Sequence, residues 1–279
     1  MNHANYFFVL GAPDPESREI EELLKFLGIP YGYAIKADKR VRSYDAYEAD
    51  EIHEMIKPYS YDPSFLSIVL VECGGNNLLK LINRYKHIIV DHHAEGHPGY
   101  GKPPEQFWEG SSIGQVYTLL GASYSKRQLM IAAADHCLGA AYAGRCANID
   151  PEELLNLRVE IKSDYKSLPY TEVMSQIFNA VNSIERANTI NILDEPVADF
   201  TYFPAPSEVG EAASILGTTV AYGEYVKGLG VYKYGIVSAK PEVIRHWMEN
   251  HALRLNLTNI YGDAERGYAG GYRETRIGT

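Results

Sequence analysis

The stretch HIIVDHH, residues 87–93, is an apolar strand that runs directly into an aspartate and two histidines. Two similar apolar runs precede it, NYFFVLG at residues 5–11 and FLSIVLVEC at residues 65–73. Such runs, without alternating polar residues, are typical of strands buried on both faces of a parallel sheet. Alternation of these strands with helices predicts an α/β domain whose parallel sheet carries helices on both faces. The other elements expected here are a strand at residues 31–35 and helices at residues 15–27 and 77–85.

The apolar period changes to that of helices after residue 110. The motif Asn148-Ile149-Asp150-Pro151 marks one helix start, because Asp caps a helix and Pro suits its first position. Helices are expected at residues 111–120, 126–143, 151–166 and 170–187.

Beyond residue 188 the pattern is mixed, and a glycine-rich tail ends the chain. Strands are expected at residues 197–203 and 232–239, and helices at residues 207–225 and 241–250. We therefore expect two domains, residues 1–188 and residues 189–279, in which helices link the first sheet to a smaller mixed α/β domain. The tyrosine-rich acidic segment at residues 44–59 has no assigned form.

Acidic side chains follow three of the expected strands. Asp14, Glu72 and Asp91 should meet at the carboxyl edge of the sheet, where ligands usually bind. Carboxylates gathered there would repel one another and raise each other's pKa unless a cation neutralised them. Oxygen ligands with a few imidazoles, here His92 and His93, suit Mn²⁺ or Mg²⁺. Such ions activate water for attack on phosphorus, so the pattern predicts a metal-dependent phosphoester hydrolase.

The tripeptide Asp91-His92-His93 at the end of a strand resembles the signature of the DHH phosphoesterase superfamily. That family also has an acidic motif after the first strand, an acidic residue ending a middle strand, and a further acidic residue on a later helix. The resemblance covers about residues 5–145. The matching positions are Pro13-Asp14-Pro15-Glu16, Glu72 in LVEC, Asp135 in AAADHC, and the small-residue helix start GSSIGQVYTLL at residues 110–120.

The resemblance implies two Mn²⁺ or Mg²⁺ ions per chain, with Glu72 shared between them. Asp14 would help to hold one ion. His93 would face the substrate phosphate as a catalytic residue, and Asp91 would orient an imidazole. His136 could supply a replacement ligand. The ligands of the other ion would be Glu16, Glu72, His92 and Asp135.

The sequence also departs from the family pattern. Leu10 stands where many relatives have a metal-binding histidine, and Glu16 and Glu72 stand where aspartate is usual. The C-terminal domain of relatives carries a glycine-rich loop that helps to hold the substrate. Residues 267–271 are the candidate for that loop, although they lack its histidine. The expected substrate-binding residues are Gly270, Gly271, Arg266 and Arg273.

Each candidate also has a structural explanation. Asp14 is well placed to cap a helix that begins at Pro15. Glu72 could reach solvent at a strand end, whereas Asp135 lies among alanines and would need a charged partner if buried. His97 in a Gly-Pro-rich loop favours a structural role. Residues 45–54 are expected to form a solvated acidic face.

Composition narrows the possible substrates and location. The net charge of −10 argues against duplex DNA binding, so the expected partner is a small phosphorylated substrate or a short single-stranded oligonucleotide. No signal peptide or long apolar span is apparent, which predicts a cytoplasmic protein without membrane contact. Three cysteines do not suggest disulfides or a zinc site, and the 22 tyrosines have no assigned role. A homodimer is possible.

Two other functions compete with the leading one. An inorganic pyrophosphatase would use similar metal chemistry but a more basic C-terminal domain. A catalytically weak nucleotide-binding module would explain the changes at Leu10, Glu16 and Glu72.

Overall fold

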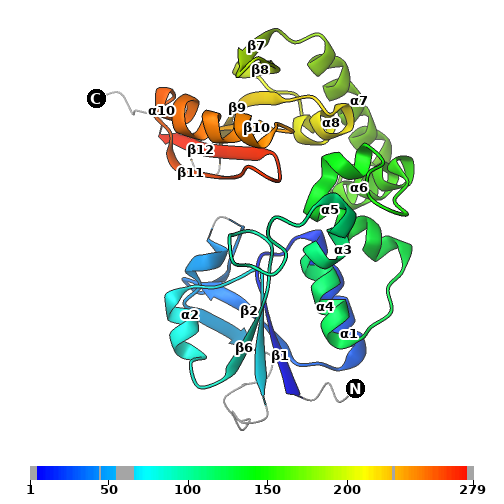
Figure 1. Cartoon of the computed structure of the whole chain (residues 1–279), viewed down its shortest axis with the longest axis vertical. Helices are drawn as coiled ribbons and strands as arrows, with labels where there is room; N and C mark the ends of the chain where they lie inside the picture. The colour runs from blue at the N-terminus through cyan, green and yellow to red at the C-terminus, as the bar shows by residue number, and fades with distance from the viewer. Residues whose placement is uncertain (1–4, 44, 55–65, 228–229, 275–279) are drawn as a thin grey trace. The chain divides into compact units, whose positions relative to one another are not determined.

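A computed structural model describes residues 5–43, 45–54, 66–227 and 230–274. The chain forms two compact units, Met1–His136 with Cys146–Ile149, and Cys137–Arg145 with Asp150–Thr279 (Figure 1). The long helix α5 (Lys126–Tyr142) crosses this boundary, and its backbone is non-helical at Cys137 (φ −154°, ψ 54°). The first unit therefore ends within α5. No helix of the described segments is long and apolar enough to cross a membrane.

The first unit contains a six-stranded sheet with the order β3-β2-β1-β5-β6, and β4 also pairs with β2. Strands β1, β2, β5 and β6 are parallel, whereas β3 and β4 run antiparallel to β2. The strands are β1 (Tyr6–Leu10), β2 (Tyr31–Lys36), β3 (Lys39–Arg40), β4 (Glu51–Glu54), β5 (Ser67–Val71) and β6 (Lys86–Val90). The helices are α1 (Pro15–Leu27), η2 (Ala46–Glu48), α2 (Asn76–Leu81), η4 (Pro104–Gln106), α3 (Phe107–Gly110), α4 (Ser112–Leu120) and the first part of α5.

Both faces of the central strands β1 and β5 are covered, as expected, whereas the edge strand β6 is mostly exposed. Phe7 and Val9 of β1 belong to a buried cluster with Leu78 and Ile82, which come from α2 and its C-terminal end. Because side chains alternate along a strand, Phe8 lies on the opposite face, where Figure 1 shows α1 and α4. The α/β prediction is therefore confirmed, and the carboxyl ends of β1, β5 and β6 lie at one edge.

The start of α1 follows directly from its sequence. Asp14 is the N-cap, and its carboxylate accepts a hydrogen bond of 2.7 Å from the backbone nitrogen of Ser17. Pro15 occupies the first helical position, and Gly28 ends the helix in the left-handed conformation (φ 65°). The capping role predicted for Asp14 is confirmed, and the cap holds the first turn, including Glu16, at the sheet edge.

The second unit has its own six-stranded sheet, with the order β11-β12-β10-β9-β8-β7. Only β8 and β9 pair in parallel among these strands as described. The strands are β7 (Thr189–Ile192), β8 (Glu195–Pro204), β9 (Val220–Val226), β10 (Val231–Val237), β11 (Thr258–Asp263) and β12 (Tyr268–Glu274). The helices are α6 (Pro151–Lys166), α7 (Tyr170–Glu185), α8 (Val209–Leu216), α9 (Pro241–His246), η5 (Trp247–His251) and α10 (Ala252–Arg254).

Helices pack on both faces of this second sheet. Val220 and Val237 form a buried cluster with Ala212 and Ala213 of α8. On the other face, Ile236 packs with Trp247 of η5. Val220 of β9 and Val237 of β10 are cross-strand partners at one end of the paired region. The packing with α8 therefore lies at that end of the two strands.

Two predictions for the second unit were wrong. The helix expected at residues 207–225 ends at Leu216, because Gly217 adopts the left-handed conformation (φ 58°), and β9 follows. The expected loop at residues 267–271 is mostly strand: Tyr268–Glu274 forms β12, whose glycines lie in register with β10. Gly217 is a local stop signal within an apolar pattern that continues past it, whereas pairing with β10 makes residues 268–274 a strand.

The unassigned segment at residues 44–59 is described in part. It contains η2 and β4, whereas residues 44 and 55–59 lie outside the described residues, as does residue 65 of an expected strand. Within this segment Tyr47 is directed to the sheet edge, where its hydroxyl donates to the Asp91 carboxylate at 2.8 Å. The expectation of a wholly solvated acidic face at residues 45–54 was therefore incomplete.

The second unit contains a buried ion-pair network centred on Glu211. Arg158 donates to both Glu211 oxygens, at 3.0 Å and 3.2 Å from Nε and 2.5 Å from Nη2. Burial raises the pKa of Glu211, but Arg158, Lys162 and Tyr142 together outweigh burial and hold the pKa at about 2. The stabilisation is therefore present above the ordinary glutamate pKa and is lost as the pH falls toward 2.

Replacing Glu211 tests this network. Glu211→Gln should lower the free energy of unfolding at pH 7 by about 3 kcal/mol, because Arg158 loses its counter-charge. Urea denaturation should show the deficit shrinking as the pH falls from about 5 to about 3. The exposed Glu185→Gln is the control and should be neutral. A deficit that does not depend on pH would contradict the ionic origin of the stabilisation.

Candidate metal centre

The carboxyl edge of the first sheet gathers acidic and imidazole side chains from distant parts of the sequence. Glu16 comes from the first turn of α1, Glu72 follows β5, and His92 follows β6. Asp135 comes from α5, near the end of the first unit. One ligand atom from each of these four residues lies within 4.8 Å of the others. The four residues that the family resemblance implies as ligands of one ion therefore lie close together in space.

His92 lies at the centre of the cluster. Its Nε2 is 3.1 Å from Glu72 Oε1 and 3.0 Å from Asp135 Oδ2. The His92 side chain is fully buried. His93 is closer to solvent, with 32% of its side chain exposed, and its Nδ1 is 4.0 Å from Glu72 Oε1. Glu72 therefore lies between the two imidazoles.

Glu16 has one oxygen that the protein does not satisfy. Oε1 accepts a hydrogen bond of 2.9 Å from the backbone nitrogen of Ile113, at the start of α4. Oε2 is buried and has no hydrogen-bond partner among the described residues. Burial, together with Asp135 and Glu72, raises the pKa of Glu16 well above its ordinary value. A cation would satisfy this oxygen and reverse that shift.

Glu72 is held in a strained backbone conformation. Its φ is 49°, in the left-handed region that residues with a Cβ rarely adopt. Ser112 Oγ donates to Glu72 Oε1 at 2.8 Å and orients the carboxylate. Gly11 leaves room for this turn, since a Cβ at residue 11 would lie 2.3 Å from the Glu72 carbonyl oxygen. The close approach of β1 and β5 therefore positions Glu72.

Asp14 lies beside the cluster but outside the four-residue group. Its carboxylate caps α1 through Ser17. Burial, Glu72 and Asp135 raise the pKa of Asp14 well above its ordinary value. The charges of Glu72 and Asp135 thus act on Asp14, although its ligand atom is not within the 4.8 Å group formed by the residues described.

Asp91 is directed away from the four-residue cluster. Its Oδ1 accepts hydrogen bonds from the backbone nitrogens of His92 (2.6 Å) and His93 (2.9 Å), and it lies 2.9 Å from His93 Nδ1. Burial raises the pKa of Asp91, but hydrogen bonding from His93 outweighs burial and lowers the pKa to about 2. Asp91 is therefore an ionised anchor for the His93 ring.

Two residues near Asp91 were not assigned to the site from the sequence. His97 Nδ1 is 3.1 Å from Asp91 Oδ1, and the His97 ring stacks on Tyr47 at 5.9 Å between centroids. Burial and the Asp91 charge raise the pKa of Tyr47, so its hydroxyl stays protonated and donates to Asp91. Only the packing of η2 against the sheet edge brings Tyr47 here, so no local signal could have identified it.

His136 makes contacts that differ from those expected of a ligand. Its Nε2 is 2.8 Å from the backbone oxygen of Lys102, and its Nδ1 is 3.1 Å from His92 Nδ1. Both ring nitrogens thus face groups other than the carboxylates. His136 is also outside the ligand groups formed by the described residues.

The four substrate-binding candidates of the second unit do not share one surface. Gly271 and Arg273 face the helix-covered side of β12: a Cβ at residue 271 would lie 3.0 Å from Leu257 Cβ, and Arg273 stacks on Tyr234 at 4.7 Å. Gly270 faces the opposite side, where a Cβ would lie 2.6 Å from the Tyr261 hydroxyl. Arg266 lies beyond the strand start, 5.7 Å from the Tyr268 ring.

Gly270 shares its side of the sheet with a group of aromatic side chains and a lysine. Lys233 Nζ lies 6.0 Å from the Tyr222 ring centroid, and the Tyr261 and Tyr272 rings are 6.0 Å apart. Lys233 pairs with Glu224 at 3.6 Å. We call Tyr222, Lys233, Tyr261 and Tyr272 the tyrosine–lysine face. It accounts for some of the tyrosines that the sequence left without a role.

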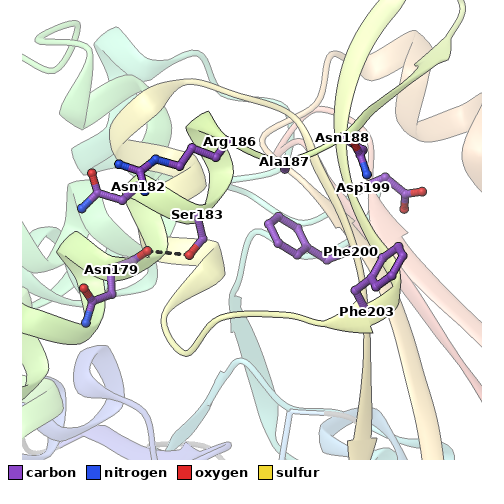
Figure 2. Close-up of a pocket in the computed structure, with 9 residues that line it drawn as sticks. All are labelled: Asn179, Asn182, Ser183, Arg186, Ala187, Asn188, Asp199, Phe200 and Phe203. Carbon is purple, nitrogen blue, oxygen red and sulfur yellow. Dashed lines mark hydrogen bonds between the residues drawn. The ribbon is translucent and has the colours of Figure 1, made fainter.

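A separate hollow of about 680 Å³ lies between α7 and β8 in the second unit (Figure 2). Phe200 and Phe203 line one side, and asparagines and Arg186 of α7 line the other (Figure 2). Asp199 is the single carboxylate among the lining residues, and it accepts a hydrogen bond from the Thr201 backbone nitrogen at 2.9 Å. This hollow therefore lacks the acid–imidazole chemistry of the sheet edge.

Comparison with protein-family models found no match for this chain, and comparison with curated proteins found none. Among solved structures, the chain is similar to a pGpG-specific phosphodiesterase, PggH from Vibrio cholerae, over 97% of this chain and 93% of that chain. The TM-score is 0.38 and the sequence identity is 9%. A similarity of this size does not establish a shared activity, so the function of this chain rests on its own residues.

The contact between Gly11 and Glu72 can be tested by substitution. Gly11→Ala should force the Glu72 backbone to move, which should cost about 1–3 kcal/mol of stability and weaken Mn²⁺ binding. Gly139→Ala is the matched control, because a Cβ at residue 139 meets no atom within 4 Å. Chemical denaturation and calorimetric titration with Mn²⁺ measure the two effects. Unchanged Mn²⁺ affinity in Gly11→Ala would contradict the placement of Glu72.

Proposed function

We propose that this chain is a divalent-metal-dependent phosphoesterase that hydrolyses a small phosphorylated substrate at the Glu16–Glu72–His92–Asp135 cluster. The observation that carries the proposal is the buried Glu16 oxygen without a partner, beside three further ligand atoms within 4.8 Å. Glu16 and Glu72 form no ion pair with lysine or arginine among the described residues. Buried carboxylates without a counter-charge are costly, and a divalent cation would supply that charge.

The donor set suits Mn²⁺ or Mg²⁺. Three carboxylates and one imidazole match the oxygen-rich, mixed coordination that these ions accept, whereas structural zinc sites favour thiolates. When bound, such an ion lowers the pKa of a coordinated water and stabilises charge on a phosphoryl oxygen. We further propose that Asp14 and Glu72 hold a second ion, since burial and the charges of Glu72 and Asp135 raise the pKa of Asp14 and a cation would offset that cost.

His93 is the proposed contact to the substrate phosphate. Its Nδ1 faces the ionised Asp91 carboxylate at 2.9 Å, which orients the ring with Nε2 directed away from Asp91. The partly exposed ring is then free to bind a phosphoryl oxygen through Nε2 or to transfer a proton there. Asp91 thus acts by orienting His93, and Tyr47 supports Asp91 from the other side.

The region at residues 189–279 is the proposed substrate-binding domain, with the tyrosine–lysine face as its contact surface. Aromatic rings provide stacking surfaces for nucleobases, and a lysine can contact a phosphate. Gly270 contributes by letting the Tyr261 ring lie against the sheet. Gly271 and Arg273 would support the face from the opposite side of β12. A short nucleotide fits this surface better than a long polymer, because the net charge of the chain is −10.

Two alternatives make different predictions for the same protein. A pyrophosphatase would release phosphate from pyrophosphate and ignore nucleotides. An inactive nucleotide-binding module would bind a nucleotide and one metal ion without turnover. The tyrosine–lysine face, which has one lysine among three aromatic rings, favours a substrate with a base over pyrophosphate.

Replacing Glu16 tests the metal-dependent reaction. We expect Mn²⁺-dependent turnover of bis(p-nitrophenyl) phosphate, linear or cyclic dinucleotides, or short oligoribonucleotides, and a loss of about 100-fold or more in Glu16→Gln. Glu22→Gln, on the exposed face of the same helix, is the control. In EDTA, Glu16→Gln should be at least as stable as wild type, because a buried unpaired carboxylate is removed. No turnover by wild type on any substrate would refute catalysis.

The tyrosine–lysine face can be tested by steady-state kinetics. Lys233→Met should raise KM for a nucleotide substrate about tenfold and leave kcat nearly unchanged, because Lys233 would bind substrate and transition state alike. Bis(p-nitrophenyl) phosphate, which has no nucleobase or sugar, should be affected less. Lys227→Met, at an exposed turn residue directly after β9, is the control. An equal KM for wild type and Lys233→Met would remove this face from substrate binding.

A further inference from the structure

We infer that His136 is a positioning residue that fixes the proton and the orientation of the His92 ring, so that His92 Nε2 is presented as a metal ligand. The inference rests on the proposed metal site, and it assigns His136 a role other than ligation. Two contacts support it. His136 Nε2 contacts the Lys102 backbone oxygen, and His136 Nδ1 contacts His92 Nδ1.

The Lys102 backbone oxygen determines which nitrogen of His136 carries the proton. A backbone carbonyl oxygen can only accept a hydrogen bond, so the nitrogen that lies 2.8 Å from the Lys102 oxygen carries a proton. In a neutral imidazole one nitrogen carries the proton and the other has a lone pair. Protonation of His136 at Nε2 therefore leaves Nδ1 as the acceptor.

His136 Nδ1 in turn determines which nitrogen of His92 carries the proton. The Nδ1 atoms of the two rings are 3.1 Å apart, so one must donate and the other accept. Because His136 Nδ1 is the acceptor, His92 Nδ1 carries the proton. His92 Nε2 then has a lone pair, and it lies 3.1 Å from Glu72 Oε1 and 3.0 Å from Asp135 Oδ2. A lone pair among carboxylate oxygens is unfavourable by itself and is suited to binding a cation.

The rings also have little freedom to rotate. They lie edge to edge with 5.4 Å between centroids and 19° between planes, and both residues are buried, with exposures of 1% for His92 and 6% for His136. Gly110 packs directly against His136, since a Cβ there would lie 2.5 Å from the ring Cε1 atom. The close contact with Gly110 therefore restricts the His136 ring to a position between the Lys102 oxygen and His92.

The position of His136 in the sequence explains how it reaches His92. Asp135 and His136 are consecutive residues of α5, and consecutive side chains on a helix point about 100° apart. Asp135 therefore faces His92 Nε2 while His136 faces His92 Nδ1. Neighbouring residues thus hold both nitrogens of one imidazole, and histidine ligands in general require such a partner on the nitrogen opposite the metal.

Two variants separate positioning from packing. His136→Leu replaces the imidazole with an apolar side chain of similar size and so removes the Nδ1 acceptor. We expect a Mn²⁺ dissociation constant 10- to 100-fold higher by calorimetric titration. His136→Asn places an amide oxygen near the position of Nδ1 and should restore affinity to within about threefold of wild type. The exposed His87→Gln is the control and should bind Mn²⁺ as wild type does.

A second measurement does not depend on metal. Long-range ¹H–¹⁵N spectra of the imidazoles at pH 8.5 should show His92 protonated at Nδ1 in wild type and His136→Asn, and redistributed toward Nε2 in His136→Leu. If wild type binds no Mn²⁺, the proposed function fails, and these spectra still test His136. The inference is overturned if His136→Leu binds Mn²⁺ like wild type, if Leu and Asn weaken binding equally, or if wild-type His92 is protonated at Nε2.

Discussion

The first unit depends on keeping several carboxylates close together in a buried place. Glu16 and Glu72 lie at the carboxyl edge of a parallel sheet and have no lysine or arginine partner among the residues described. In the second unit, by contrast, the buried Glu211 is neutralised by Arg158. The contrast shows that the chain can pair a buried acid when folding requires it. The unpaired state at the sheet edge is therefore better explained by function than by packing.

Local features around this edge serve the same arrangement. Asp14 caps α1 and so fixes the turn that carries Glu16. The start of α4 contributes the Ile113 backbone nitrogen to Glu16 and the Ser112 hydroxyl to Glu72. These groups orient each carboxylate through a single oxygen without neutralising its charge. The backbone strain at Glu72 is consistent with a residue held in place by its surroundings.

The histidines divide into two groups according to what holds them. His93 is anchored by the ionised Asp91 and remains partly exposed. His92 is buried, with its Nδ1 facing His136 and its Nε2 facing the carboxylates. Adjacent residues of one tripeptide thus occupy different environments, and the proposed roles follow from that difference. The second unit offers a different chemistry, with three tyrosine rings and the Lys233–Glu224 ion pair on one side of its sheet.

The sequence by itself determined the α/β character of the first unit and the elements that carry its site, because buried strands, caps and strand-end acids are local patterns. Asp14 as a helix cap, and the positions of Glu72 and Asp91 at strand ends, are examples. It could not determine the strand nature of residues 268–274, because hydrogen bonds to β10 stabilise that strand. Only the tertiary structure decided that Tyr47 and His97 lie beside Asp91, and that His136 faces His92 rather than the carboxylates. Such contacts depend on the direction of each side chain after packing, and no local spacing in the sequence records that direction.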